Sequence, residues 1–288
     1  MNKRLIWALV ATAFAAPAAS LEAPAPARLA PTVEHAQTAY LSAQLLGRYH
    51  YKTQPLDDAM SEKIFERYLK ALDPERLFFT QADIDSFSDA RTRLDDAIQR
   101  GNLAIPFAIF QRYEPRTVER LTHAREVLKQ GFEFDTRESY PYLREKAPWP
   151  KDDAEVRDLW RKRVKNDWLR LKLAGKDDKL IRETLEKRYD NYLARSARNK
   201  SDDVFQIFMN AYAMSIEPHT NYLGRSASDD FDISMRLSLV GIGAVLQERD
   251  EYITIRELVP GGPAAKSGKL AVGDRIVGVG QAEGAVAD

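Results

Sequence analysis

Glycine is distributed unevenly along this chain, and that distribution limits the folds open to it. Only four of the fourteen glycines occur before residue 224, whereas the last 65 residues hold the other ten. Glycine weakens helix interiors and supplies the positive φ angles that tight turns need. The first part of the chain is therefore predicted to be helical and the second to be turn-rich and β-like. Together they predict an α+β protein, with a mainly α N-terminal domain followed by a smaller β-rich domain.

Charge and composition exclude several classes of protein. The 288 residues carry 43 basic and 43 acidic side chains, so no long-range field favours binding to nucleic acid. Hydrophobic residues make up 44% of the chain, which is enough for a sizeable core and argues against disorder. The chain contains no cysteine, which excludes disulfides, a thiolate nucleophile and cysteine-ligated zinc. No cofactor is predicted.

The N-terminus has the layout of a secretory signal peptide. Positive residues precede an apolar run from Leu5 to Ala16, and small residues follow at 18–20. The run is shorter than the roughly 18 to 20 apolar residues that span a bilayer. We therefore predict a cleaved signal peptide over 1–20, a periplasmic protein, and no stable membrane insertion after cleavage. Residues 21–31, rich in Ala and Pro, are predicted to form a flexible lead-in.

Helical periodicity dominates the predicted N-terminal helical domain, 32–223. One helix is predicted to end at Asp73, because the following proline disfavours a helical conformation there. Thr80 and Asp83 have the spacing of a capping box and predict a helix running toward Gly101. Three further helices are predicted. The first covers 151–175, the second carries Leu180 to Leu193 and leads to Asn199, and the third runs from Ser201 to Ser215. The apolar positions behind these predictions are Phe65, Tyr68, Leu69 and Leu72; Val156, Leu159, Trp160, Val164 and Trp168; and Leu180, Leu185, Tyr189 and Leu193.

A predicted linker at 224–232 leads to short runs of β-forming residues separated by turns. The four residues PGGP at 260–263 are a strong signal for a chain reversal. The predicted strands cover 233–239, 243–246, 252–258 and 274–279. We predict that a small β-rich domain occupies 233–288.

Two glycines, Gly241 and Gly243, flank Ile242 directly before one of these strands. Paired glycines let successive backbone N–H groups turn toward one point and bind an anion. A dinucleotide phosphate is disfavoured, because the third glycine of that motif is missing and no long helix follows. A tight turn without a ligand is a second interpretation. The third is the terminal carboxylate of a peptide that adds a strand to the sheet edge.

The sequence downstream favours the peptide interpretation. After the Gly-Ile-Gly loop come VPGGPAA at 259–265 and LAVGDRIVGV at 270–279, and the three motifs in this order resemble a PDZ domain. The resemblance assigns binding of a peptide's carboxylate to Gly241, Ile242, Gly243 and Ala244. It assigns pairing with the peptide strand to Val245 and Leu246.

Further segments closely resemble the periplasmic tail-specific proteases, also called carboxyl-terminal processing serine proteases. These segments are DPERLFF at 73–79, FMNAY at 208–212, EPHTNYL at 217–223 and SLVGIGAVL at 238–246. The resemblance covers most of the chain after the predicted signal peptide. It implies that the PDZ domain binds the C-terminal tails of protein substrates. It leaves any adaptor protein unknown.

The same resemblance implies a serine nucleophile and a lysine general base on a catalytic domain that follows the PDZ domain. Neither maps to a residue here, since the adjacent Lys266 and Ser267 lie in the turn-and-helix region of the PDZ domain. We expect the chain to hold the first half of the PDZ domain, no catalytic residue and no proteolytic activity of its own. Two rival interpretations are a non-enzymatic periplasmic peptide-binding or adaptor protein, and a purely structural helical protein with an incidental β tail.

No metal site is predicted. The histidines are scattered without the spacing of metal ligands, and the acidic cluster lacks the glycine and distal glutamate of a calcium loop. One histidine, His219, is predicted to order the region between the domains through hydrogen bonds. The four histidines are His35, His50, His123 and His219, and the acidic cluster is Asp229, Asp230 and Asp232.

Overall fold

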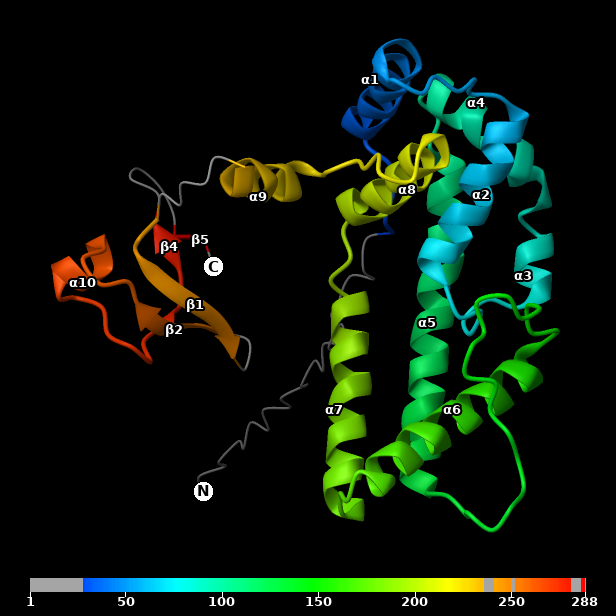
Figure 1. The fold of residues 1–288 in the computed structure, drawn as a ribbon. Helices are drawn as coiled ribbons and strands as arrows, with labels where there is room; N and C mark the ends of the chain where they lie inside the picture. Colours follow the sequence, from blue (N-terminus) through cyan, green and yellow to red (C-terminus); the bar gives the residue numbers. More distant parts are fainter. Residues whose placement is uncertain (1–27, 236–240, 250–251, 281–285, 288) are drawn as a thin grey trace, which may run out of the picture. The chain divides into compact units, whose positions relative to one another are not determined.

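The computed structural model describes residues 28–235, 241–249, 252–280 and 286–287. The chain divides into a helical unit, 1–221, and a smaller unit, 222–288, that contains the β-strands (Figure 1). The predicted α+β fold class, mainly α and then β-rich, is confirmed. The predicted signal peptide, 1–20, lies outside the described residues. Among the described residues, no helix is both long enough and apolar enough to cross a bilayer.

The helical unit is built from α-helices and one 3₁₀ helix. In chain order these are α1 (Val33–Tyr49), α2 (Asp58–Leu72), α3 (Gln81–Asp85), the 3₁₀ helix η1 (Ser88–Thr92), α4 (Leu94–Gln99), α5 (Ala104–Gln130), α6 (Asp153–Leu173), α7 (Asp178–Ser196) and α8 (Ser201–Ile216). The smaller unit contains α9 (Arg225–Met235), β1 (Ala244–Arg249), β2 (Tyr252–Leu258), α10 (Pro263–Ser267), β3 (Arg275–Ile276), β4 (Val279–Gly280) and β5 (Val286–Ala287).

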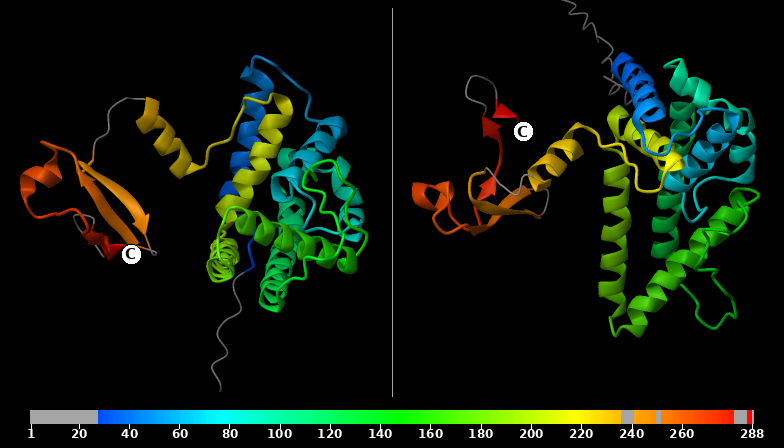
Figure 2. Two further views of the ribbon diagram at one scale, coloured as in Figure 1. Left: turned by 60° about the horizontal axis from the view of Figure 1, so that its bottom comes forward. Right: turned by 45° about the horizontal axis from the view of Figure 1, so that its top comes forward.

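The long helix α5 runs through the helical unit, with α7 beside it and α6 lying obliquely across it (Figures 1 and 2). Where α5, α6 and α7 meet, a core forms around Trp160, whose Nε1–H donates to the carbonyl of Leu77 at 2.8 Å. Burial of this apolar surface is the main source of stability for the three helices. The fully buried members of this core include Leu121, Ala124, Leu128, Val156, Val164, Ile181 and Leu185.

Helix α2 follows its sequence signals closely. The side chain of Asp57 accepts the Met60 N–H at 2.9 Å and caps the start of the helix, and Asp73 stands at its end. All four predicted apolar positions are buried, namely Phe65, Tyr68, Leu69 and Leu72. The ring of Tyr68 packs edge-on against Phe208 of α8, with ring centroids 5.6 Å apart. The prediction for this helix, including its end, is confirmed.

The single helix predicted from Thr80 toward Gly101 is wrong in its extent. The capping box of Thr80 and Asp83 is present, but α3 ends after five residues, and η1 and α4 follow as separate turns. At the first break, the Ser86 hydroxyl donates to the Asp83 carbonyl at 2.6 Å. At the start of α4, the Leu94 N–H donates to the hydroxyl of Ser61 at 2.8 Å instead of to a helical carbonyl. Serine side chains thus replace part of the helical hydrogen bonding.

Two details of the later helices also differ from the prediction. In α7 the predicted apolar position Leu180 is 43% exposed, and its neighbour Ile181 is buried instead, together with Leu185 and Tyr189. In α8 the N-cap position is Lys200, not Ser201, and the Lys200 N–H donates to the Asp203 carboxylate at 2.8 Å. The Ser201 hydroxyl instead accepts the N–H of Ala30 at 3.3 Å, which ties the end of the predicted lead-in to the helical unit.

The sequence patterns predicted neither α1 nor α5. The residues that α1 buries are Ala39, Ala43 and His35, while its larger apolar side chains are exposed, so its buried face carries little hydrophobic signal. Helix α5 contains Pro115 in its interior, and an interior proline normally ends or kinks a helix because it has no N–H to donate. Packing against α6 and α7 maintains the helix across this position.

Between α5 and α6, residues 131–152 contain no helix or strand, and we call them the connecting segment. A connection this long within a compact domain is uncommon. It is held to the helical unit at several points: Gln81 N–H donates to the Pro150 carbonyl at 2.7 Å, and Arg76 stacks over the Trp149 ring at 4.9 Å. The connecting segment is therefore a docked part of the unit.

In the smaller unit, β1, β2 and β3 form an antiparallel sheet in that order, and β4 pairs with β5. The strand predicted at 252–258 is confirmed as β2, and the predicted chain reversal at 260–263 leads into α10. The strand predicted at 233–239 is wrong over its first three residues, because Ile233 to Met235 belong to α9; residues 236–239 lie outside the described residues. Helix α9 also covers most of the predicted linker, 224–232.

Candidate peptide-binding site

The Gly-Ile-Gly loop leads directly into β1 and rests on the turn that precedes α10. The carbonyl of Ile242 accepts the N–H of Ala264 at 2.7 Å, and the carbonyl of Gly243 accepts the N–H of Val259 at 2.8 Å. The carbonyls of Ile242 and Gly243 therefore point toward residues 259–264. These two bonds fix the orientation of two successive peptide planes.

The orientation of the carbonyls determines where the loop's N–H groups point. In a planar trans peptide, the C=O of one residue and the N–H of the next point in opposite directions. Since the carbonyls of Ile242 and Gly243 face the 259–264 turn, the N–H groups of Gly243 and Ala244 face away from it. Two adjacent N–H groups on the open side of a loop form the geometry that binds an anion.

The two glycines of the loop have different structural roles. Gly243 has a φ of +73°, and a Cβ built there would lie 3.0 Å from both the Cα of Gly262 and the Cδ of Pro263. Both the backbone angle and the close contact require glycine at this position. At Gly241, a Cβ would meet no heavy atom within 4 Å. The paired-glycine motif does not distinguish the two positions, and the structure places the requirement for glycine on Gly243.

Strand β1 lies at the edge of its sheet. It pairs with β2 along one side, from Ala244 opposite Leu258 to Arg249 opposite Tyr252, and no other described strand pairs with it. The predicted pairing residues, Val245 and Leu246, are both more than 40% exposed. An extended peptide can add to such an edge through backbone hydrogen bonds. A bulge interrupts the register between these two residues, because Arg256 of β2 has no partner in β1.

Sequence reasoning missed the residues that support the loop from behind. Gly262, Pro263 and Ala264 contact the loop, and a Cβ at Gly262 would lie 3.1 Å from the Cα of Gly243. The PGGP motif was the available signal, but it predicted only a chain reversal. Ser267 of α10 donates its hydroxyl to the Ala264 carbonyl at 2.8 Å, so its hydrogen bond is local to this helix.

Two histidines form hydrogen bonds at the C-terminal end of the helical unit. The ring Nδ1 of His219 lies 2.8 Å from a carboxylate oxygen of Glu217, and the His219 N–H donates to the other oxygen at 2.7 Å. These contacts lower the pKa of the Glu217 carboxyl, with the hydrogen bond from the His219 side chain as the largest cause. His50 Nε2 lies 2.8 Å from the Thr220 hydroxyl and connects this region to the end of α1. His219 does form hydrogen bonds, but its partner is Glu217, two residues earlier, and its side chain is 91% exposed. Its contacts are therefore local to the segment after α8, and no contact to the predicted linker, 224–232, is among them.

Comparison with known proteins identifies the family. A profile described as the tail-specific protease N-terminal domain matches residues 41–226, and a PDZ domain profile matches residues 231–285. The chain is also 42% identical over 244 residues to a tail-specific protease from Haemophilus influenzae, and this alignment covers 84% of the chain and 35% of that protein. The chain thus spans about a third of the length of this curated relative. With both domains matched in the same order, the chain belongs to the tail-specific protease family.

Proposed function

We propose that this chain recognises protein substrates of a periplasmic tail-specific serine protease by their C-terminal tails. The observation that carries the proposal is the pair of outward-facing N–H groups at Gly243 and Ala244, directly before an edge strand. The N–H groups bind the terminal carboxylate, and the tail pairs with β1 beyond it. Hydrogen bonds to a charged group contribute about 1.5 to 3 kcal/mol each, which favours a free C-terminus over an internal segment.

The exposed side chains beside the loop point to the kind of tail that is bound. Ile242, Val245 and Leu246 present apolar surface at this edge. A tail that ends in apolar residues buries this surface when it adds to β1. The catalytic steps belong to the serine and lysine of the family's catalytic domain, and the proposal assigns neither role to a residue of this chain.

A peptide with and without its terminal charge tests this proposal. We expect the chain to bind a fluorescein-labelled peptide that ends in three apolar residues and a free carboxylate at least about tenfold more tightly than the same peptide amidated. Fluorescence polarisation at several salt concentrations measures both dissociation constants. Equal affinity for the two peptides would contradict carboxylate recognition, even if both bind.

The periplasmic location rests on the predicted signal peptide. We expect the natural product to lack its first residues, with cleavage between Ala18 and Ala23, because small residues follow the apolar run there. Mass spectrometry of the protein isolated from its own cells measures the N-terminus. An intact Met1 in the mature protein, or recovery from the cytoplasmic fraction alone, would contradict the proposed export.

A further inference from the structure

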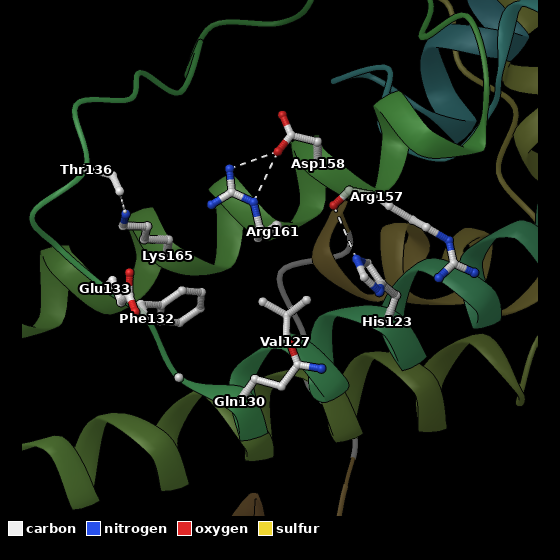
Figure 3. Close-up of a pocket in the computed structure, with 11 residues that line it drawn as sticks. His123, Val127, Gln130, Phe132, Glu133, Thr136, Arg157, Asp158, Arg161 and Lys165 are labelled. Atoms are coloured by element: carbon white, nitrogen blue, oxygen red, sulfur yellow. Dashed lines mark hydrogen bonds and ion pairs between the residues drawn. The ribbon is translucent and has the colours of Figure 1, made fainter.

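A cavity of about 420 Å³ lies between the end of α5, one face of α6 and the start of the connecting segment, within the range typical of small-ligand sites. Figure 3 shows the residues around it. His123 and Val127 come from α5, Phe132 and Thr136 from the connecting segment, and Arg161 and Lys165 from α6.

The centre of this cavity is apolar. In Figure 3 the side chains of Val127 and Phe132 project into the space between α5 and α6. Val127 is almost fully buried, and the Phe132 ring is supported from behind by the Trp168 ring, with centroids 6.0 Å apart. An apolar group of a ligand would therefore contact a preformed apolar surface rather than water.

The rim of the cavity on α6 already holds a carboxylate. Arg161 donates to both oxygens of Glu138, with an Nη1 to Oε1 distance of 3.1 Å, and the ammonium of Lys165 contacts Oε1 as well. Hydrogen bonds from these two cations hold the pKa of the Glu138 carboxyl at about 2, so it stays ionised at neutral pH. The forked contact is the geometry with which arginine selects carboxylates.

The charges around this rim balance only when Glu138 is included. Arg161 also donates to Asp158 at 2.8 Å, and Lys162 pairs with the same carboxylate. The side chains that line the cavity include three cations, Arg157, Arg161 and Lys165, and two carboxylates, Glu133 and Asp158. The Glu138 carboxylate, which pairs with Arg161 and Lys165, balances the third cation. Loss of the Glu138 charge would leave one positive charge in excess.

We propose that this cavity is a binding site for a small carboxylate that carries an apolar group, and that Glu138 is an internal competitor for it. The apolar group packs against Val127 and Phe132, and the carboxylate binds Arg161 and Lys165. Glu138 occupies these cations when the site is empty and is displaced when a ligand binds. This inference does not depend on the function proposed for the PDZ domain, since it concerns the helical unit alone.

If Glu138 competes with the ligand, its removal should strengthen ligand binding. Replacing a carboxylate that only braces the connecting segment would loosen the cavity and weaken binding. Replacing a competitor would strengthen binding, because Arg161 and Lys165 no longer have to exchange one carboxylate for another. The variant Glu138→Gln separates the two cases.

The test is a titration of the 288-residue chain followed by two-dimensional NMR, with the Gly131 amide at the cavity wall as the reporter. The probes are N-acetyl-L-phenylalanine and its amide, which has no carboxylate. We expect the acid to bind Glu138→Gln about fivefold more tightly than the unsubstituted chain, and Lys165→Gln about fivefold more weakly. N-acetyl-L-phenylalanine amide should not shift the NMR signal of Gly131.

Two matched controls assign the effect to the cavity. Lys172→Gln removes the same charge from the same helix at an exposed residue that does not line the cavity and pairs with Asp178, and Glu62→Gln removes an exposed carboxylate of α2; neither should change the affinity. Gly243→Val should also leave it unchanged, which separates this site from the PDZ loop. The proposal is overturned if Glu138→Gln binds the acid more weakly, if Lys172→Gln matches Lys165→Gln, or if the acid does not shift the Gly131 signal.

Discussion

Replacing Gly243 with valine should lower the affinity of the chain for a free C-terminal tail by at least about tenfold. The Gly243 φ of +73° is unfavourable for any residue with a Cβ, most of all for a β-branched one. The added side chain would also collide with Gly262 and Pro263, each 3.0 Å from the new Cβ. Relief of this strain must rotate the peptide planes that aim the N–H groups of Gly243 and Ala244. Fluorescence polarisation with the tail peptide measures the loss.

Gly241→Val is the matched control for this prediction. It makes the same chemical change two residues earlier, where a Cβ meets nothing within 4 Å, and it should bind the tail within about twofold of the unsubstituted chain. The NMR signals of Ile255, the buried residue of β2, report whether the sheet of each variant is intact. If Gly243→Val keeps full affinity with an intact sheet, the N–H groups of this loop do not bind the tail.

The largest loss of stability is expected for Asp73→Ala in the helical unit. The Asp73 side chain is buried, and its two oxygens accept the N–H groups of Leu77, Phe78 and Phe79 at 2.8, 2.8 and 3.1 Å. Without the carboxylate, three buried donors lose their acceptor at once. Arg144, which is buried nearby and donates to the carbonyl of Glu75 at 3.2 Å, also loses the Asp73 side chain as a neighbour. We expect the free energy of unfolding to fall by about 3 to 5 kcal/mol.

Urea denaturation followed by tryptophan fluorescence measures this loss for the helical unit alone, because the sequence after residue 221 contains no tryptophan. Asp73→Asn keeps an acceptor oxygen and should lose less stability than Asp73→Ala. Asp85→Ala, at an exposed position of α3, should change the free energy of unfolding by less than about 0.5 kcal/mol. A loss at Asp73→Ala no larger than at Asp85→Ala would show that water replaces the carboxylate as the acceptor.

Signals that lie close together in the chain predicted their elements, and contacts between distant residues decided the rest. The C-terminal end of helix α2 and both ends of strand β2 were predicted, because the apolar spacing, Asp73-Pro74 and the turn residues act within a few positions of one another. Helix α5 was not predicted, since its interior Pro115 is a local signal against a helix that long-range packing overrides. The division of 81–101 into three short helices likewise depends on Ser61, a residue of another helix.

The candidate sites show the same division. The family, the order of the domains and the stretch of chain that contains the peptide loop could be read from the sequence, because motif order and residue spacing are properties of the chain alone. The folded structure was needed to distinguish Gly243 from Gly241, to orient the N–H groups at Gly243 and Ala244, and to bring Glu138 onto Arg161 and Lys165. Peptide-plane orientation and ion pairing depend on partners distant in sequence, which no local pattern records.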